Sequence, residues 1–268
     1  MGRGPARVGM ALLVVLLVVG AGLSQVSWRQ PPDQSPSFPE KAEFFFLRLE
    51  YTDLFRSGRG FGRAFGRGWW MQDWPEADIH FAQGVRRLTR IDVGEGRHVP
   101  LTDDRIFEYP WIYATQVGYW DLTGAELDRL REYFLRGGFM VVDDFWGPAE
   151  WEVFRAAMER VLPGQPILEI PEGDPMMHVL YDITERTLIP GLRHLRTGPG
   201  GAIVSVPQDG PPQWRAIYDG RGRMIVAIHY NMDIGDAWEH ADMPEYPEAA
   251  TGLAYRLAIN SIIYSMTH

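Results

Sequence analysis

The strongest constraint on the fold is a fully apolar strand pattern that lies between two amphipathic helix patterns. Residues 139–142 read Phe-Met-Val-Val, and four apolar residues in succession are typical of a strand covered on both faces. Residues 123–136 and 148–161, on either side, carry apolar side chains at helical spacing. Strand and helix patterns in alternation predict a parallel sheet joined by right-handed crossovers, and therefore an α/β fold.

The ends of these helices are marked by residues with specific capping roles. Thr123 and Glu126 have the spacing of a capping box, and Gly137 follows the last apolar position of the same helix. Pro148 suits the first turn of the next helix. Two further strands are expected in residues 43–51 and 106–118, and a hairpin is expected around Asp219 and Gly220. Helices are expected in residues 75–91, with Phe81, Val85 and Leu88 on one face, and in the long apolar segment 246–268. Residues 165–212 predict an irregular segment on the rim of the sheet, which acts as a lid or as a partner-binding arm.

Composition excludes several classes of site. Cysteine is absent from the 268 residues, which excludes disulfides, zinc–thiolate sites, iron–sulfur clusters and cysteine nucleophiles. The formal net charge is -9, so a nucleic-acid partner is not expected.

The N-terminal part of the sequence predicts export. Residues 1–24 combine Arg3 and Arg7 with a following apolar run, which is typical of a signal peptide or, alternatively, of a single membrane anchor. Residues 25–42 are rich in proline and predict a linker, and residues 43–268 predict one α/β domain. We expect a periplasmic or other extracytoplasmic location. If the segment is uncleaved, it is the only membrane contact and anchors the domain to the inner membrane, facing the periplasm.

The first candidate site lies where the apolar strand ends. Asp143, Asp144 and Trp146 follow the strand directly, and ligands of open α/β sheets bind at the carboxyl ends of the strands. Adjacent residues of a strand point to opposite faces, so both acids serve one site only if the chain turns there. Two interpretations stay open: capping of the following helix, or binding of a ligand or metal by at least one acid.

The second candidate site is the segment that reads IHYNMDIGDAWEHAD. His229, Asn231 and Asp233 alternate and share one face if the strand continues that far. Asp236 and Trp238 follow in a turn, where an exposed indole beside acids suits sugar stacking. The spacing matches no named zinc or calcium motif, so a hydrogen-bonded turn is the alternative. The candidate ligands of a divalent metal are Asp144, His229, Asp233 and Asp236.

Two further features carry weaker signals. Arg59, Arg63 and Arg67 lie in a glycine-rich segment that has neither dinucleotide nor Walker spacing. It is a basic surface loop or a lid that grips an anion. His178 lies in an apolar run and is either a core histidine or a general base.

Several separated motifs resemble a known bacterial family. GGFMVVDDFWG, FFFLRLEY, DIGDAWEHAD and AINSIIYSMTH are similar in order and character to the family called domain of unknown function 4159. The resemblance implies a flavodoxin-like three-layer sandwich with a mainly parallel central sheet, similar to class I glutamine amidotransferases. Those enzymes use a cysteine nucleophile, and this chain has none, so glutaminase activity by that mechanism is excluded.

The sequence favours one function and leaves two others open. The first is a non-catalytic module on a degenerate amidotransferase-like fold that binds a cell-envelope protein or a glycan. The second is a metal-dependent hydrolase in which an ion at the strand ends activates water. The third is a glycosidase with Asp144 and Asp236 as paired carboxylates.

Overall fold

A computed structural model describes Met1 and residues 40–54, 68–201, 203–206 and 209–268. The predicted leader, most of the predicted linker and the loop with Arg59, Arg63 and Arg67 lie outside the described residues. The chain divides into residues 1–35 and residues 36–268, and every helix and strand below belongs to the second unit.

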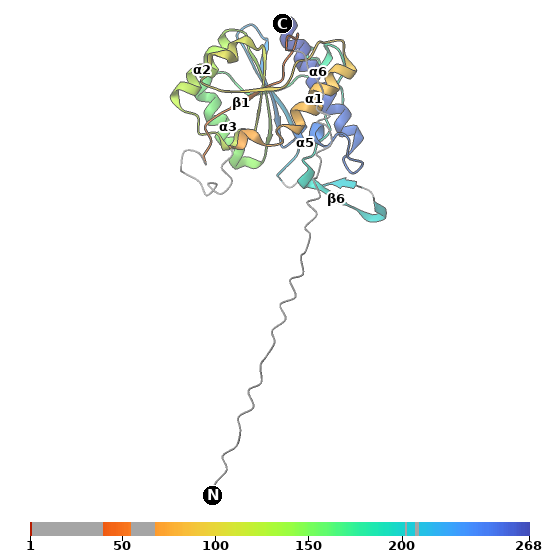
Figure 1. Cartoon of the computed structure of the whole chain (residues 1–268). Coiled ribbons are helices and arrows are strands. Elements are labelled where there is room, and N and C mark those ends of the chain that lie inside the picture. Colours follow the sequence, from red (N-terminus) through yellow and green to blue (C-terminus); the bar gives the residue numbers. More distant parts are fainter. Residues whose placement is uncertain (2–39, 55–67, 202, 207–208) are drawn as a thin grey trace. The chain divides into compact units, whose positions relative to one another are not determined.

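The centre of the domain is a seven-stranded, mostly parallel sheet (Figure 1). Its first five strands in spatial order run parallel to one another, and the two remaining pairings, of the fifth strand with the sixth and of the sixth with the seventh, are antiparallel. The order is β2 (Arg97–Pro100), β1 (Leu47–Glu50), β3 (Trp111–Thr115), β4 (Phe139–Phe145), β9 (Met224–Tyr230), β8 (Gln213–Tyr218) and β5 (Leu168–Glu169). The predicted α/β class and the mainly parallel sheet are therefore confirmed.

Successive strand residues point to opposite sides of the sheet, so an apolar strand presents side chains on both faces. Helices cover both of these faces. On β3, Trp111 and Tyr113 enter one hydrophobic core, and Ile112 and Ala114 enter the other. The first core is covered by α1 (Glu76–Leu88), α4 (Pro175–His178), α5 (Ile234–Glu239) and α6 (Glu248–Thr267), the second by α2 (Gly124–Leu135) and α3 (Gly147–Val161). Single 3-10 turns are η2 (Trp69–Met71), η3 (Asp104–Glu108), η4 (Val117–Tyr119), η5 (Leu192–His194) and η6 (Pro199–Gly201).

The predicted helix ends agree with the structure at α2 and α3. The Thr123 side chain accepts from the backbone of Glu126, whose carboxylate in turn accepts from the backbone of Thr123 at 2.7 Å. Pro148 lies in the first turn of α3. One expected core position is wrong, because Leu88 at the end of α1 is 52% exposed while Phe81 and Val85 are fully buried. Leu88 is the last residue of α1.

The irregular region differs from the expectation in one respect. Its residues 168–169 form β5, which joins the sheet as the last strand rather than lying outside it. The remainder contains α4 and a separate hairpin of β6 (Leu195–Thr197) and β7 (Ile203–Ser205). The predicted hairpin around Asp219 is confirmed as the β8–β9 pair.

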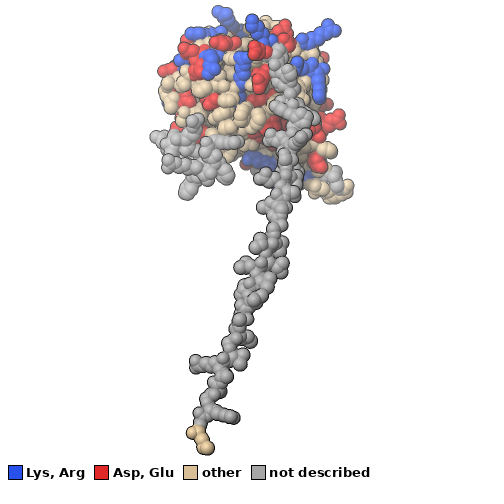
Figure 2. All heavy atoms as spheres, viewed as in Figure 1, with Lys and Arg blue, Asp and Glu red and all other residues tan. Residues whose placement is uncertain are grey.

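Within the described part of the chain, no helix combines the length and the apolar character that crossing a bilayer requires. On the face seen in Figure 2, Lys and Arg side chains gather toward the end of the domain that carries the C-terminus, with acids interspersed.

Candidate functional site

The end of β4 is a β-bulge that redirects two consecutive acids. Pairing with β9 is regular up to Val142 and then shifts register before Phe145. Asp144 lies at the shift with φ +50, a left-handed conformation that is uncommon for residues other than glycine. A bulge breaks the alternation of side chains. The turn that the sequence interpretation required is therefore present between Asp143 and Asp144.

Asp143 joins three elements of the fold. Its Oδ2 atom accepts from the Tyr113 hydroxyl at 3.0 Å and from the backbone N–H groups of Ile234 and Gly235, each at 2.9 Å. Tyr113 belongs to β3, and the two N–H groups begin α5. Burial, together with the charge of Asp144, raises the pKa of Asp143 to about 8 against the opposing effect of these hydrogen bonds.

Asp144 is held by two side-chain donors. Its Oδ1 accepts from the indole N–H of Trp146 at 2.6 Å, and its Oδ2 accepts from the Gln116 amide. Gln116 follows β3 and has φ +53. Burial raises the pKa of Asp144 to about 6, even though the Trp146 hydrogen bond favours the charged form.

Three aspartates from three parts of the chain meet at this end of the sheet. Asp73, Asp144 and Asp233 each offer a carboxylate oxygen, and these oxygens lie within 4.8 Å of one another. Asp73 comes from the turn between η2 and α1, and Asp233 caps α5 by accepting from the backbone of Asp236 at 2.8 Å. All three are at least nine-tenths buried. We call Asp73, Asp144 and Asp233 the aspartate triad.

No member of the triad is paired directly with a basic side chain of the described residues, although the charges of Arg48 and Arg193 partly offset the rise in the pKa of Asp73 and of Asp144. No Lys or Arg in the described ranges forms an ion pair with any of its members. Burial raises the pKa of Asp73 and of Asp233, and repulsion from the other acids raises both further. A buried carboxylate without a counter-charge costs several kcal/mol per ion. Protonation of the triad or a bound cation would remove this cost.

Asp73 has an oxygen that points to the same conclusion. Its Oδ1 accepts from the Gln72 amide at 2.6 Å, while its Oδ2 is buried and has no hydrogen-bond partner among the described residues. A Cβ atom on Gly235 would lie 2.8 Å from this Oδ2 atom. Buried carboxylate oxygens normally have a hydrogen-bond partner. A buried oxygen without one, beside two other carboxylates, is therefore a suitable ligand atom for a cation.

Arg48 positions the turn that carries Asp73. Its guanidinium is fully buried and pairs with Asp78. The same group donates to the backbone carbonyls of Gln72 at 2.8 Å and Trp70 at 3.2 Å. A planar, multi-donor group of this kind fixes the backbone on which Asp73 sits.

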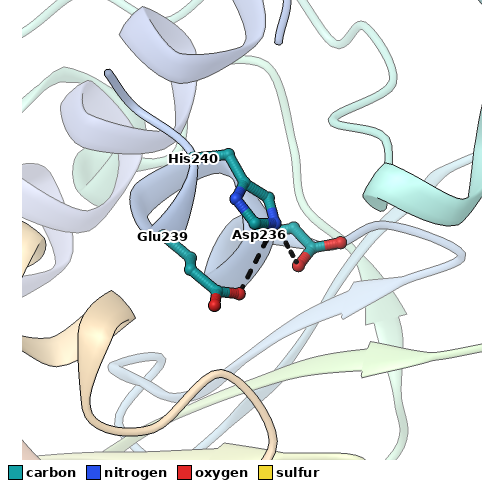
Figure 3. A group of neighbouring side chains, drawn as sticks. All are labelled: Asp236, Glu239 and His240. Atoms are coloured by element: carbon teal, nitrogen blue, oxygen red, sulfur yellow. Dashed lines mark ion pairs between the residues drawn. The ribbon is translucent and has the colours of Figure 1, made fainter. Parts of the chain in front are cut away.

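A second group of possible ligand atoms lies on α5 (Figure 3). The Nε2 atom of His240 is 3.5 Å from Asp236 Oδ1 and 3.5 Å from Glu239 Oε2. Hydrogen bonding to Asp236 raises the pKa of His240, so its protonated form is favoured here. Asp236 is buried, whereas Glu239 and His240 are partly exposed. An internal ion pair therefore accounts for this group without a metal.

The sequence matches the model of a known protein family over most of its length. The family is described as a domain of unknown function (DUF4159), and its model matches residues 52–266. The chain belongs to this family. No curated protein matches it. The aspartate triad is therefore a feature of a DUF4159 domain, and its chemistry follows from its own residues.

The structure brings together some of the predicted site residues of this DUF4159 domain. Asp144 and Asp233 lie in the triad, with Asp236 next to Asp233 through the α5 cap. Trp146 contacts Asp144 directly. The aspartate triad also includes Asp73, which the sequence interpretation missed. The signal was weak, because a single acid in the segment MQDWPE before a helix is indistinguishable from an ordinary cap.

His229 and Asn231 lie apart from the triad, and the expected alternation with Asp233 is wrong. β9 ends at Tyr230 and Asn231 has φ +57, so the strand does not continue. His229 is fully buried against Trp214, and burial lowers its pKa to about 3. Asn231 instead accepts from the backbone of Gly147 at 2.9 Å and ties α3 to the end of β9.

Two other predicted residues occupy different environments from those expected. Trp238 is wholly buried and packs on Phe81 with ring centroids 4.6 Å apart, so the exposed stacking surface is wrong. His178 is not a core residue, since its side chain is 32% exposed and contacts Asp182 at 3.0 Å. The reasons differ. Trp238 lies on the buried side of α5. His178 is the last residue of the four-residue α4, and its side chain lies at the surface.

Proposed function

We propose that this DUF4159 domain binds a hard divalent cation, Mg²⁺ or Mn²⁺, through the aspartate triad. The observation that carries the proposal is the meeting of three buried carboxylates that have no basic partner in the described ranges. Oxygens bound to one such ion at about 2.0–2.6 Å lie within about 5 Å of one another, and the triad meets this requirement.

The bound ion gives the domain its binding role. Three protein ligands leave coordination positions open on an ion that prefers six. Oxygen atoms of an outside ligand, on a glycan or a partner protein of the cell envelope, fill these positions. The domain is then a non-catalytic, cation-dependent recognition module whose ligand approaches the carboxyl ends of β3, β4 and β9.

A metal-dependent hydrolase is the second candidate, and the same open positions favour it. Water that occupies them is acidified by the ion and can act as a nucleophile, which removes the need for a cysteine or serine. Turnover of an ester or glycoside substrate that requires Mn²⁺ and is lost in Asp144→Asn would favour this candidate over the recognition module. The pairing of Asp144 with Asp236 as glycosidase carboxylates stays a prediction.

The test of the main proposal is isothermal titration of the full chain, stripped of metal by a chelator and then dialysed. We expect saturable Mn²⁺ and Mg²⁺ binding to the wild-type protein. Asp144→Asn and Asp233→Asn should weaken it at least tenfold, while the matched control Asp128→Asn, at an exposed acid of α2, should leave it unchanged. Absence of binding to a folded wild-type chain would refute the proposal.

The fold and the location are proposed on separate grounds. The strand order β2-β1-β3-β4-β9 supports a flavodoxin-like arrangement related to amidotransferases, because the first strand lies second in the sheet. The N-terminal sequence supports export to the periplasm. Cell fractionation and N-terminal sequencing of the processed protein test the second point.

A further inference from the structure

Arg193 is an exposed arginine that stacks on an aromatic residue of the candidate site. Its guanidinium carbon lies 5.0 Å from the centroid of the Trp146 ring, within the range of a cation–π contact. The indole N–H of Trp146 donates to Asp144 Oδ1 at 2.6 Å. One indole therefore contacts both the guanidinium and a carboxylate of the aspartate triad, and the positive charge of Arg193 opposes the rise that burial causes in the pKa of Asp144.

The backbone that carries Arg193 is fixed to the start of α5. The backbone N–H of Asp233, a member of the triad, donates to the carbonyl of Ile189 at 3.0 Å. The backbone N–H of Leu192 donates to Asp236 Oδ2 at 2.6 Å. These two hydrogen bonds hold the segment before Arg193 against the acids of α5, so the place of its side chain beside the triad is set by the fold.

The donors of the Arg193 guanidinium are not used by the described part of the chain. There it forms no ion pair and donates no hydrogen bond, although its charge also acts on Glu150. The Glu150 carboxylate is engaged elsewhere, because it accepts from the backbone N–H of Trp146 at 2.7 Å. An arginine that is held by stacking and keeps its N–H groups available is suited to bind an anion from outside.

A phosphate group matches the triad ion and Arg193 together. Hard cations such as Mg²⁺ are commonly bound by one or two carboxylates and by the phosphate oxygens of a ligand. The parallel N–H groups of a guanidinium fit two oxygens of a phosphate. A phosphate monoester has three terminal oxygens, so it can bind the ion through one and the guanidinium through the other two. A carboxylate has only two oxygens and cannot make all of these contacts.

We propose that the ligand of this recognition module carries a phosphate group, whose oxygens bind both the triad ion and the Arg193 guanidinium. This inference rests on the proposed function, because the ion supplies half of the phosphate site. It narrows the ligand from any molecule with suitable oxygens to one that presents a phosphate, and it assigns Arg193 as a residue that determines specificity.

The test is titration calorimetry of the full chain, saturated with Mg²⁺, with phenylphosphonate as the probe, because its carbon–phosphorus bond resists hydrolysis. We expect saturable binding that requires Mg²⁺ and is tighter than the binding of benzoate, which carries a carboxylate on the same ring. Arg193→Met keeps an unbranched side chain over Trp146 but removes the donors, and should weaken binding roughly tenfold to a hundredfold. The matched control Arg155→Met, at an exposed arginine of α3, should leave it unchanged.

The affinity for the cation itself distinguishes recognition from a structural role. Arg193→Met removes a positive charge near the triad, so the variant should bind Mg²⁺ at least as tightly as the wild type. A variant whose site was merely distorted would lose affinity for both Mg²⁺ and phenylphosphonate. Inorganic phosphate is titrated in parallel, and the tighter of the two probes shows whether the ligand is a phosphate group attached to a larger molecule or the free ion.

The outcomes separate the two proposals. A folded wild type that binds neither Mg²⁺ nor Mn²⁺ overturns the proposed function and this inference with it. A wild type that binds the cation but neither phosphorus probe overturns the inference alone. Equal affinity for benzoate, binding that persists without Mg²⁺, or wild-type affinity in a folded Arg193→Met variant also overturns it. Thermal unfolding establishes that each variant is folded, and Arg193→Lys, which loses the paired donors, decides the matter if Arg193→Met is not.

Discussion

The Asp143 carboxylate accepts a hydrogen bond from the backbone N–H of Gly235 at 2.9 Å, across 92 residues of sequence. The contact fixes the start of α5 against the end of β4, and α5 is the helix that Asp233 caps and Asp236 belongs to. Asp143 is therefore not a member of the aspartate triad but holds β4 and α5 together beside it. Its neighbour Asp144 contributes an oxygen to the triad.

Replacement of Asp143 should destabilise the fold. Asp143→Ala leaves three buried donors without their acceptor, and each unsatisfied group costs about 1–3 kcal/mol. We expect the free energy of unfolding to fall by about 3–5 kcal/mol, measured by urea unfolding with tryptophan fluorescence. Asp143→Asn keeps an acceptor oxygen and should cost less. Equal stabilities of Asp143→Ala and the exposed control Asp128→Ala would show that the three hydrogen bonds contribute nothing.

The metal-free protein should lose stability as the pH rises from 6.5 to 8.5. The pKa of Asp143 is raised to about 8 in the folded chain, while an unfolded aspartate titrates near 3.9. In this window the folded state binds more protons than the unfolded state, so the free energy of unfolding falls with increasing pH. The expected decrease is about 1–2 kcal/mol.

Asp143→Asn provides the comparison for this pH effect. The variant lacks the titrating carboxyl group, so its stability should change less over the same window. The raised pKa of His240 acts in the same direction in both proteins. The lowered pKa of His229, about 3, opposes the decrease weakly at the lower end of the window, and it does so in both proteins. Parallel pH profiles for the two proteins would contradict the assignment to Asp143.

Binding of a cation to the triad should stabilise the fold. At a concentration one hundred times the dissociation constant, a ligand that binds only the folded state adds about 2.7 kcal/mol. For a domain of this size, that corresponds to a rise in Tm of about 5–10 °C, measurable by differential scanning calorimetry with and without Mn²⁺. Asp233→Asn should show a much smaller rise. A full rise in that variant would place the ion elsewhere.

Arg48→Lys should weaken cation binding even though Arg48 is not one of the proposed ligands. Lysine keeps a positive charge near Asp78 but cannot reproduce the donors to Trp70 and Gln72, so the turn that carries Asp73 loses its support. Outer-shell changes of this kind typically lower metal affinity 10–100-fold. Titration calorimetry with Mn²⁺ at a temperature where the variant is folded measures this effect.

The control for the Arg48 prediction is Arg129→Lys. Arg129 pairs with Asp104 and Glu132 in a partly exposed position on α2, and neither partner belongs to the triad. Its replacement should leave the affinity for Mn²⁺ unchanged. An Arg48→Lys variant with wild-type affinity and reduced stability would assign Arg48 a purely structural role.

Much of the fold follows from local patterns. The apolar run of β4 and the capping box of α2 are short-range signals, and both correspond to observed elements. Leu88 shows the limit of such signals, because helical periodicity identifies a face but not how far along the helix that face stays buried. β5 shows the same limit, since a two-residue strand carries no periodicity at all.

The candidate site is harder to predict from the sequence than the fold is. Asp144 and Asp233 are predictable because they follow strand patterns, whereas Asp73 lies in a turn without a distinctive motif. His229 fitted an alternation that the structure ends at Tyr230, just before the left-handed Asn231. A positive φ at a residue other than glycine depends on tertiary contacts, and no short-range pattern reports it.

The sequence by itself determined the α/β class, the absence of cysteine chemistry and the end of the sheet where acids collect. Each of these depends on composition or on neighbours within a few residues. Only the tertiary structure decided which acids meet, because Asp73, Asp144 and Asp233 come from segments far apart in the chain. Their proximity results from strand order, the β4 bulge and the backbone held by Arg48, and these are properties of the assembled sheet.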